Sequence, residues 1–130
     1  MLVFNLKRKW YEMIRDGGKT VEYRVAKPYW TIRIYNELYK LKFIHHPRLL
    51  QYIKEFCTPE TFMQKLIEMN PFILTEKDKI TIPCILRLGY TKTYMTANIK
   101  KILYLTGHKT DLKSSRKTYA FFLGDIKDGI

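Results

Sequence analysis

A glycine turn followed by alternating charged residues is the segment of the sequence best suited to hold a ligand. Gly17 and Gly18 permit a tight turn and a close approach of the backbone to a bound molecule. In an extended strand after this turn, Thr20, Glu22 and Arg24 share one face. Glu22 could accept hydrogen bonds from a base edge, and Arg24 could bind a phosphate. An ion pair that braces a sheet is an equal alternative for these two residues.

Lys19 is the residue on which an enzymatic function would depend. It shares the opposite face of the expected strand with Val21 and Tyr23. A buried lysine that releases its proton can act as a base or a nucleophile, and Glu22 would be the neighbouring carboxylate. No acidic residue lies between residues 79 and 105, so the later strands provide no second carboxylate. A lysine that binds a phosphate, or is exposed in the turn, is the favoured alternative.

The positive charge of the chain is confined to its two flanks. The 24 basic and 12 acidic residues give a net charge of +12. Residues 1–35 contribute +5 and residues 79–130 contribute +7, whereas residues 36–78 are neutral. A polyanion is the simplest partner for such a surface, because each neutralised phosphate releases condensed counterions. A surface charged for solubility is the alternative.

Aromatic residues beside basic residues in expected turns add surfaces on which unpaired bases can stack. Trp30 is the main example, since it follows Lys27 and Tyr29 in such a segment. Most other aromatic residues are expected in the core. The predicted nucleic-acid-binding residues are Lys7, Lys19, Thr20, Glu22, Tyr23, Arg24, Lys27, Tyr29, Trp30, Arg87, Tyr90 and Lys92.

Hydrophobic periodicity predicts the elements that position these residues in the first flank. Alternation predicts a strand over residues 2–7. The spacing of Trp10, Met13 and Ile14 predicts a helix over residues 8–15, which the following glycines end. The same flank is completed by a strand (20–24), a turn (27–30) and a short extended segment (32–35).

The neutral middle of the chain is helical in pattern. Residues 47–57 and 58–69 repeat apolar side chains at helical spacing, and prolines stand at both expected helix starts. We therefore expect one domain over residues 1–130, with a helical insertion at about 36–78.

The second flank is extended in pattern. Period-two alternation predicts strands over residues 80–88, 95–105 and 119–126. Pro83 indicates that the first of these is an edge strand or contains a bulge. The chain is therefore of the α+β class, with a small sheet that must close or curl to bury one face.

The remaining composition excludes several kinds of protein. Cys57 and Cys84 lie in apolar patterns without metal-site spacing, so we expect reduced core thiols in a cytoplasmic protein. The histidines suggest no metal site, and no cofactor is expected. No run of about 18 apolar residues occurs, so no membrane span or membrane partner is predicted.

Several of these motifs, taken in order, resemble the ASCH domain family of the PUA-like superfamily, in its small bacterial and phage form. Residues 10–24 (WYEMIRDGGKTVEYR) are similar to its opening helix, Gly-Lys turn and Glu-Tyr-Arg strand. Residues 27–30 (KPYW), 87–90 (RLGY) and 121–126 (FFLGDI) are similar to its continuation, a later strand and turn, and its closing strand. The likeness covers both flanks, about two-thirds of the chain.

The resemblance implies a PUA-like small β-barrel with flanking helices and a cleft beside the first helix and the Gly-Lys turn. It also implies RNA binding, hydrolysis of the acetyl amide of N4-acetylcytidine, or RNA cleavage. In the acetylcytidine amidohydrolases, a lysine at the position matching Lys19 works with a threonine and a glutamate. Here Glu22 stands at the position of that threonine, which counts against this reaction.

The preferred expectation is an RNA- or nucleotide-binding module that uses a basic cleft at the Gly-Lys turn and the Glu-Tyr-Arg strand. One alternative is a small hydrolase acting on a modified nucleoside, or a ribonuclease, with Lys19 and Glu22 at its catalytic centre. Another is a non-catalytic domain that binds a protein partner through the helical insertion.

Overall fold

A computed structural model describes residues 1–40, 72–74, 81–106 and 116–129 of the chain. Within these residues, two helices and seven strands are present. In chain order they are β1 (Leu2–Leu6), α1 (Arg8–Arg15), β2 (Val21–Val25), α2 (Pro28–Lys40), β3 (Phe72–Leu74), β4 (Ile82–Leu88), β5 (Tyr94–Thr106), β6 (Lys117–Leu123) and β7 (Lys127–Asp128).

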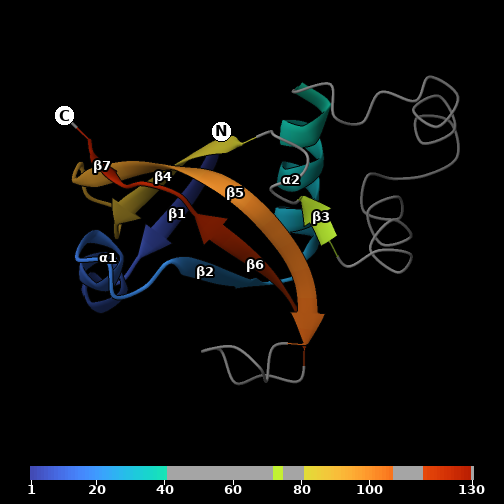
Figure 1. The fold of residues 1–130 in the computed structure, drawn as a ribbon, viewed down its shortest axis with the longest axis horizontal. Helices are drawn as coiled ribbons and strands as arrows, with labels where there is room; N and C mark the ends of the chain where they lie inside the picture. Colours follow the sequence, from blue (N-terminus) through green and yellow to red (C-terminus); the bar gives the residue numbers. More distant parts are fainter. Residues whose placement is uncertain (41–71, 75–80, 107–115, 130) are drawn as a thin grey trace, which may run out of the picture.

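The strands form one mixed sheet that curls into a half-barrel (Figure 1). The strand order is β1-β4-β5-β6-β2, and the short strands β3 and β7 pair with β5. β1 runs parallel to β4, and the other pairs are antiparallel. β1 and β2 are thus the two edges of the main path, with α1 near one end of the curled sheet and α2 near the other. This is a small, barrel-like α+β fold, as the periodicity predicts.

Strict alternation on β1 and β4 builds one side of the core. On β1, Leu2, Phe4 and Leu6 are buried, and on β4 the buried residues are Ile82, Cys84 and Leu86. The two sets lie in register, with Leu2 opposite Cys84 and Phe4 opposite Leu86. Because directly paired residues share one face of a sheet, these six side chains form a continuous apolar layer.

Residues 28–40 form the helix α2, so the predicted turn and extended segment are wrong. The helix arises because Pro28 suits a first helical position and because Trp30, Ile34 and Leu38 recur every four residues. All three are buried, and the Trp30 ring stacks on Phe4 with centroids 5.0 Å apart. Ile32 and Ile34 alternate with other residues over a short stretch, a pattern that is also typical of a strand. The segment is helical because the longer apolar stripe packs in the core.

The first helix matches its predicted range, but its buried face differs from the prediction. Tyr11 and Ile14 are buried in α1, whereas Trp10 and Met13 are only partly covered. The helix ends as expected, since Gly17 has a φ of +83° that disfavours a side chain.

The predicted strands of the second flank are also present, with two differences. The strand expected over residues 119–126 is β6, which begins earlier, at Lys117, and ends at Leu123, so residues 124–126 lie between β6 and β7. The prediction that Pro83 marks an edge strand or a bulge is wrong, because β4 lies between β1 and β5. Pro83 is tolerated because pairing with β1 begins only at Cys84. Register shifts occur elsewhere in the described sheet, between Ile99 and Lys101 of β5 and between Phe72 and Leu74 of β3.

Part of the predicted insertion lies outside the described residues. Nothing described tests the helices expected over residues 47–57 and 58–69, nor the environment of Cys57. Residues 72–74 of the same region form the strand β3, and the predicted boundary at residue 36 falls inside α2. Cys84 is a free, buried thiol whose pKa burial raises to about 12, as expected for a core cysteine. Among the described helices, none has the length and apolar character needed to cross a membrane.

Candidate functional site

A cavity of about 400 Å³ opens along the seam between the two edge strands of the half-barrel. β1 and the residues after it supply one wall, β2 supplies the other, and α1 and α2 each contribute a tryptophan. The lining residues are Asn5, Leu6, Lys7, Trp10, Lys19, Glu22, Tyr23, Arg24, Val25, Lys27 and Trp30. The volume is within the usual range for a small-molecule site, about 300–1,000 Å³.

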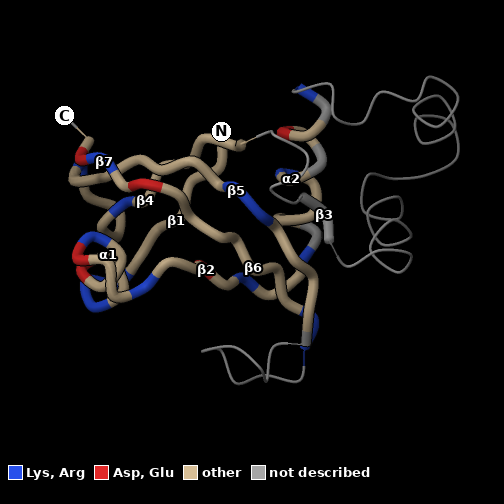
Figure 2. The backbone as a smooth tube through the Cα atoms, viewed as in Figure 1, with Lys and Arg blue, Asp and Glu red and all other residues tan. Residues whose placement is uncertain are grey.

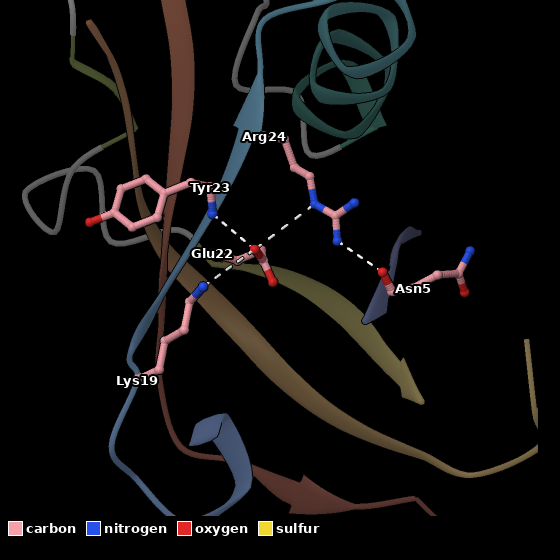
Figure 3. A network of polar contacts seen from close by, with 5 residues as sticks. All are labelled: Asn5, Lys19, Glu22, Tyr23 and Arg24. Atoms are coloured by element: carbon pink, nitrogen blue, oxygen red, sulfur yellow. Dashed lines mark hydrogen bonds and ion pairs between the residues drawn. The ribbon is translucent and has the colours of Figure 1, made fainter. Parts of the chain in front are cut away.

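Arg24 joins the two edges of the sheet across this seam. Its Nη2 donates a hydrogen bond of 3.1 Å to the main-chain oxygen of Asn5 on β1 (Figure 3). Its guanidinium carbon also lies 5.4 Å from the centre of the Phe4 ring and 5.3 Å from that of Trp30. The edges are therefore linked by a side chain whose planar cation lies near two aromatic rings.

Glu22 provides a buried carboxylate at the centre of the site. It is 5% exposed, because it lies opposite the buried Phe121 in the β2–β6 pair and so faces the same side of the sheet. Its Oε1 accepts a hydrogen bond of 3.0 Å from the main-chain N–H of Tyr23. The same oxygen lies 3.8 Å from Lys19 Nζ and 4.0 Å from Arg24 Nε (Figure 3). A single carboxylate thus lies between two cations.

Lys19 lies beside Glu22, so its predicted place on the opposite face is wrong. The alternation rule does not apply to it, because β2 begins only at Val21. The main-chain N–H of Lys19 donates to Met13 O at 3.0 Å, which holds the turn against α1. Its Nζ then lies 4.4 Å from the centre of the Trp10 ring. Both the carboxylate and the ring attract the charged ammonium.

The structure brings some of the predicted site residues together and separates others. The residues that line the cavity are Lys7, Lys19, Glu22, Tyr23, Arg24, Lys27 and Trp30. The predicted residues outside the cavity lining are Thr20, Tyr29, Arg87, Tyr90 and Lys92. Thr20 is exposed, and Tyr90 and Lys92 are exposed in the β4–β5 turn.

The two predicted stacking residues of α2, both expected to be exposed, differ in exposure in the structure. Trp30 was expected in an exposed turn, but it is 8% exposed and belongs to the core as well as the cavity wall. Tyr29 beside it is 51% exposed. The reason is the helix itself, which turns position 30 inward and position 29 outward.

Sequence reasoning missed four lining residues, namely Asn5, Leu6, Trp10 and Val25. Trp10 was assigned to the core because of its helical spacing, yet it is only partly covered and lies near Lys9 as well as Lys19. Its place directly after the basic run Lys7-Arg8-Lys9 was the signal available in the sequence. Both tryptophans of the chain therefore line the cavity.

Comparisons of the chain with protein-family models, with curated proteins and with solved structures found no match. The function must therefore be inferred from the chemistry of the cavity.

Proposed function

We propose that the chain binds RNA or a nucleotide in the seam cavity. The observation that carries this proposal is the buried Glu22 carboxylate placed between Lys19 and Arg24 inside a basic, aromatic-lined cavity. Cations, a flat aromatic surface and one fixed acceptor are the three groups needed to hold a phosphate, a base plane and a base edge.

Glu22 favours a base that offers an amino group. An ionised carboxylate accepts hydrogen bonds and donates none, and glutamate pairs with the N4 amine of cytosine. A base with only a carbonyl at this position, such as uracil at O4, would face the carboxylate with another acceptor. We therefore expect cytidine nucleotides to bind more tightly than uridine nucleotides.

The phosphate would be bound by the exposed lysines of the cavity. Lys7 and Lys27 line the cavity and are exposed, and neither forms an ion pair with another described residue, so their ammonium groups can reach a ligand. Lys and Arg positions also lie along β5 and β6, away from α1 (Figure 2). Such a distribution would support non-specific attraction of a polyanion in addition to binding at the cavity.

The half-barrel and the place of the cavity support the proposal further. The cavity lies beside α1 and the Gly-Lys turn, where the resemblance to ASCH domains places a cleft. Membership of the PUA-like superfamily is part of this proposal.

The test is the affinity for a short, labelled single-stranded RNA measured by fluorescence anisotropy between 50 and 200 mM salt. Each phosphate contact contributes about 0.7 to the slope of log K against log salt for a single strand. Replacing Lys7 and Lys27 by alanine should therefore weaken binding and reduce this slope by about 1.4. Neither substitution removes a partner of Glu22, so the variant should remain folded.

A matched control removes the same charge elsewhere. Lys100 and Lys101 lie on β5 and do not line the cavity, so replacing both by alanine should change the affinity much less. Absence of RNA binding at low salt, an affinity insensitive to salt, or equal losses in both double variants would overturn the proposal.

A hydrolase is a second candidate, favoured by the 3.8 Å distance between Lys19 Nζ and Glu22 Oε1 inside the cavity. These groups could act as a nucleophile or base with an adjacent carboxylate, on N4-acetylcytidine or on RNA. Thr20 does not line the cavity, so the lining offers no threonine beside Lys19 and Glu22. Incubation with N4-acetylcytidine and with RNA, followed by mass spectrometry, tests this candidate. Turnover that survives Lys19→Ala would exclude Lys19 as the catalytic residue.

A further inference from the structure

Tyr29 and Arg33 form a stacked pair on the exposed side of α2. The guanidinium carbon of Arg33 lies 3.4 Å from the centre of the Tyr29 ring. Arg33 Nη1 also donates a hydrogen bond of 3.2 Å to the main-chain oxygen of Tyr29. Tyr29 is 51% exposed and Arg33 is exposed as well. A flat, positively charged surface is therefore held in place before any ligand binds.

This pair, the Tyr29–Arg33 platform, lies directly beside the seam cavity. The Tyr29 ring meets the Trp30 ring edge-to-face, with centroids 5.0 Å apart and an interplanar angle of 76°. Trp30 lines the cavity, and so does the exposed Lys27 two residues before Tyr29. A ligand that fills the cavity and continues past Lys27 would next meet the platform.

An aromatic ring backed by a guanidinium is a known kind of surface for an unpaired base. Unpaired bases of single-stranded RNA stack on aromatic rings and on guanidinium planes, whatever the identity of the base. Because Arg33 is already bonded to the main chain of its own helix, little side-chain freedom is lost on stacking. Neither Tyr29 nor Arg33 lines the cavity, so the platform is a separate binding surface.

We propose that the ligand is a single-stranded oligoribonucleotide of at least two nucleotides. One base occupies the cavity, Lys27 binds the phosphate that follows it, and the next base stacks on the Tyr29–Arg33 platform. This inference rests on the proposed function, since it extends the ligand of the same cavity. It specifies an RNA segment with unpaired bases, in preference to a free mononucleotide.

The test compares cytidine 3′-monophosphate, whose phosphate follows its base as in the proposal, with the dinucleotide cytidylyl-(3′→5′)-cytidine by isothermal titration calorimetry. Each ligand carries one phosphate group, so the second nucleoside is the main addition. We expect the dinucleotide to bind the wild-type chain about tenfold more tightly, the lower part of the range for one base on an aromatic ring. Tyr29→Ala should abolish this gain and leave mononucleotide affinity within about twofold of wild type.

Three control variants separate stacking from charge and from general effects. Tyr29→Phe should keep the gain, whereas Arg33→Lys should lose part of it, because lysine keeps the charge but not the plane. Tyr90 was also predicted to bind nucleic acid, but it is 91% exposed in the β4–β5 turn and lies outside the cavity lining, so Tyr90→Ala should leave both affinities unchanged. All four substitutions are at exposed positions, so the variants should fold as the wild type does.

The outcomes distinguish this inference from the proposed function. If the mononucleotide binds and the dinucleotide binds no better, the platform proposal is wrong and the proposed function stands. A loss of dinucleotide affinity that is equal in Tyr29→Ala and Tyr90→Ala would also overturn it. If neither ligand binds, the proposed function fails, and the platform proposal fails with it.

Discussion

Replacing Glu22 by glutamine tests whether one carboxylate holds the seam of the half-barrel together. Glutamine keeps the oxygen that accepts the N–H of Tyr23, but it removes the negative charge between Lys19 and Arg24. Removal of one partner from a fully buried ion pair costs about 3–5 kcal/mol. Because Arg24 is 26% exposed and the ion-pair distances are 3.8 and 4.0 Å, we expect a loss of about 2 kcal/mol in the free energy of unfolding.

A double-mutant cycle with Lys19→Met makes this prediction specific to the pair. If the loss arises because a cation is left without its carboxylate partner, Lys19→Met in the Glu22→Gln background should recover about 1 kcal/mol of the free energy of unfolding. The assay is chemical denaturation of the four proteins, followed by circular dichroism. Wild-type stability in Glu22→Gln, or a coupling free energy below about 0.5 kcal/mol, would refute the electrostatic account of the seam.

Three further predictions concern the supporting fold. Gly17→Ala should lower the free energy of unfolding by about 1 kcal/mol, because φ at Gly17 is +83°. Gly18→Ala should lower it less, because the new Cβ would meet only an ordinary contact. Denaturation of both variants checks this. Trp30→Ala should cost about 3–5 kcal/mol, since the ring is a core residue, and a loss below 1 kcal/mol in the same assay would contradict that assignment. Burial raises the pKa of Cys84 from 9.0 to about 12 and that of Tyr119 from 10.0 to about 12, so the unfolded chain releases these protons first and stability should fall as pH rises from about 9 to 12. Cys84→Ala should remove most of the fall between pH 9 and 10, and an unchanged pH profile in denaturation would show that this thiol is not its cause.

Local patterns predicted the elements whose two faces differ clearly. β1 alternates Leu2, Phe4 and Leu6 with more exposed residues, and α1 is ended by the glycine whose backbone conformation it requires. These features depend on residues close together in the sequence, so local patterns are enough to predict them. The same holds for Glu22 and Arg24, which share a face of β2 as the alternation requires. Both take part in the polar contacts shown in Figure 3.

The remaining features depend on contacts between distant segments. α2 was misread because Trp30 and Ile34 gain their burial from rings and strands elsewhere, including Phe4 on β1. The cavity exists because β1 and β2 become opposite edges of one curled sheet, and Arg24 then reaches Asn5, nineteen residues earlier. No local spacing encodes that approach. Trp10 and Asn5 were missed as site residues for this reason.

The most direct test of the central claim is the response of the two tryptophans to a ribonucleotide. Trp10 and Trp30 are the only tryptophans of the chain and both line the cavity, so their indole N–H signals in a ¹H–¹⁵N spectrum report on that site. On titration with cytidine 5′-monophosphate, we predict that both signals shift together with the main-chain N–H of Tyr23, which donates to Glu22. Shifts confined to Lys101 on β5 and Lys117 on β6, with unchanged indole signals, would contradict a nucleotide site in the seam.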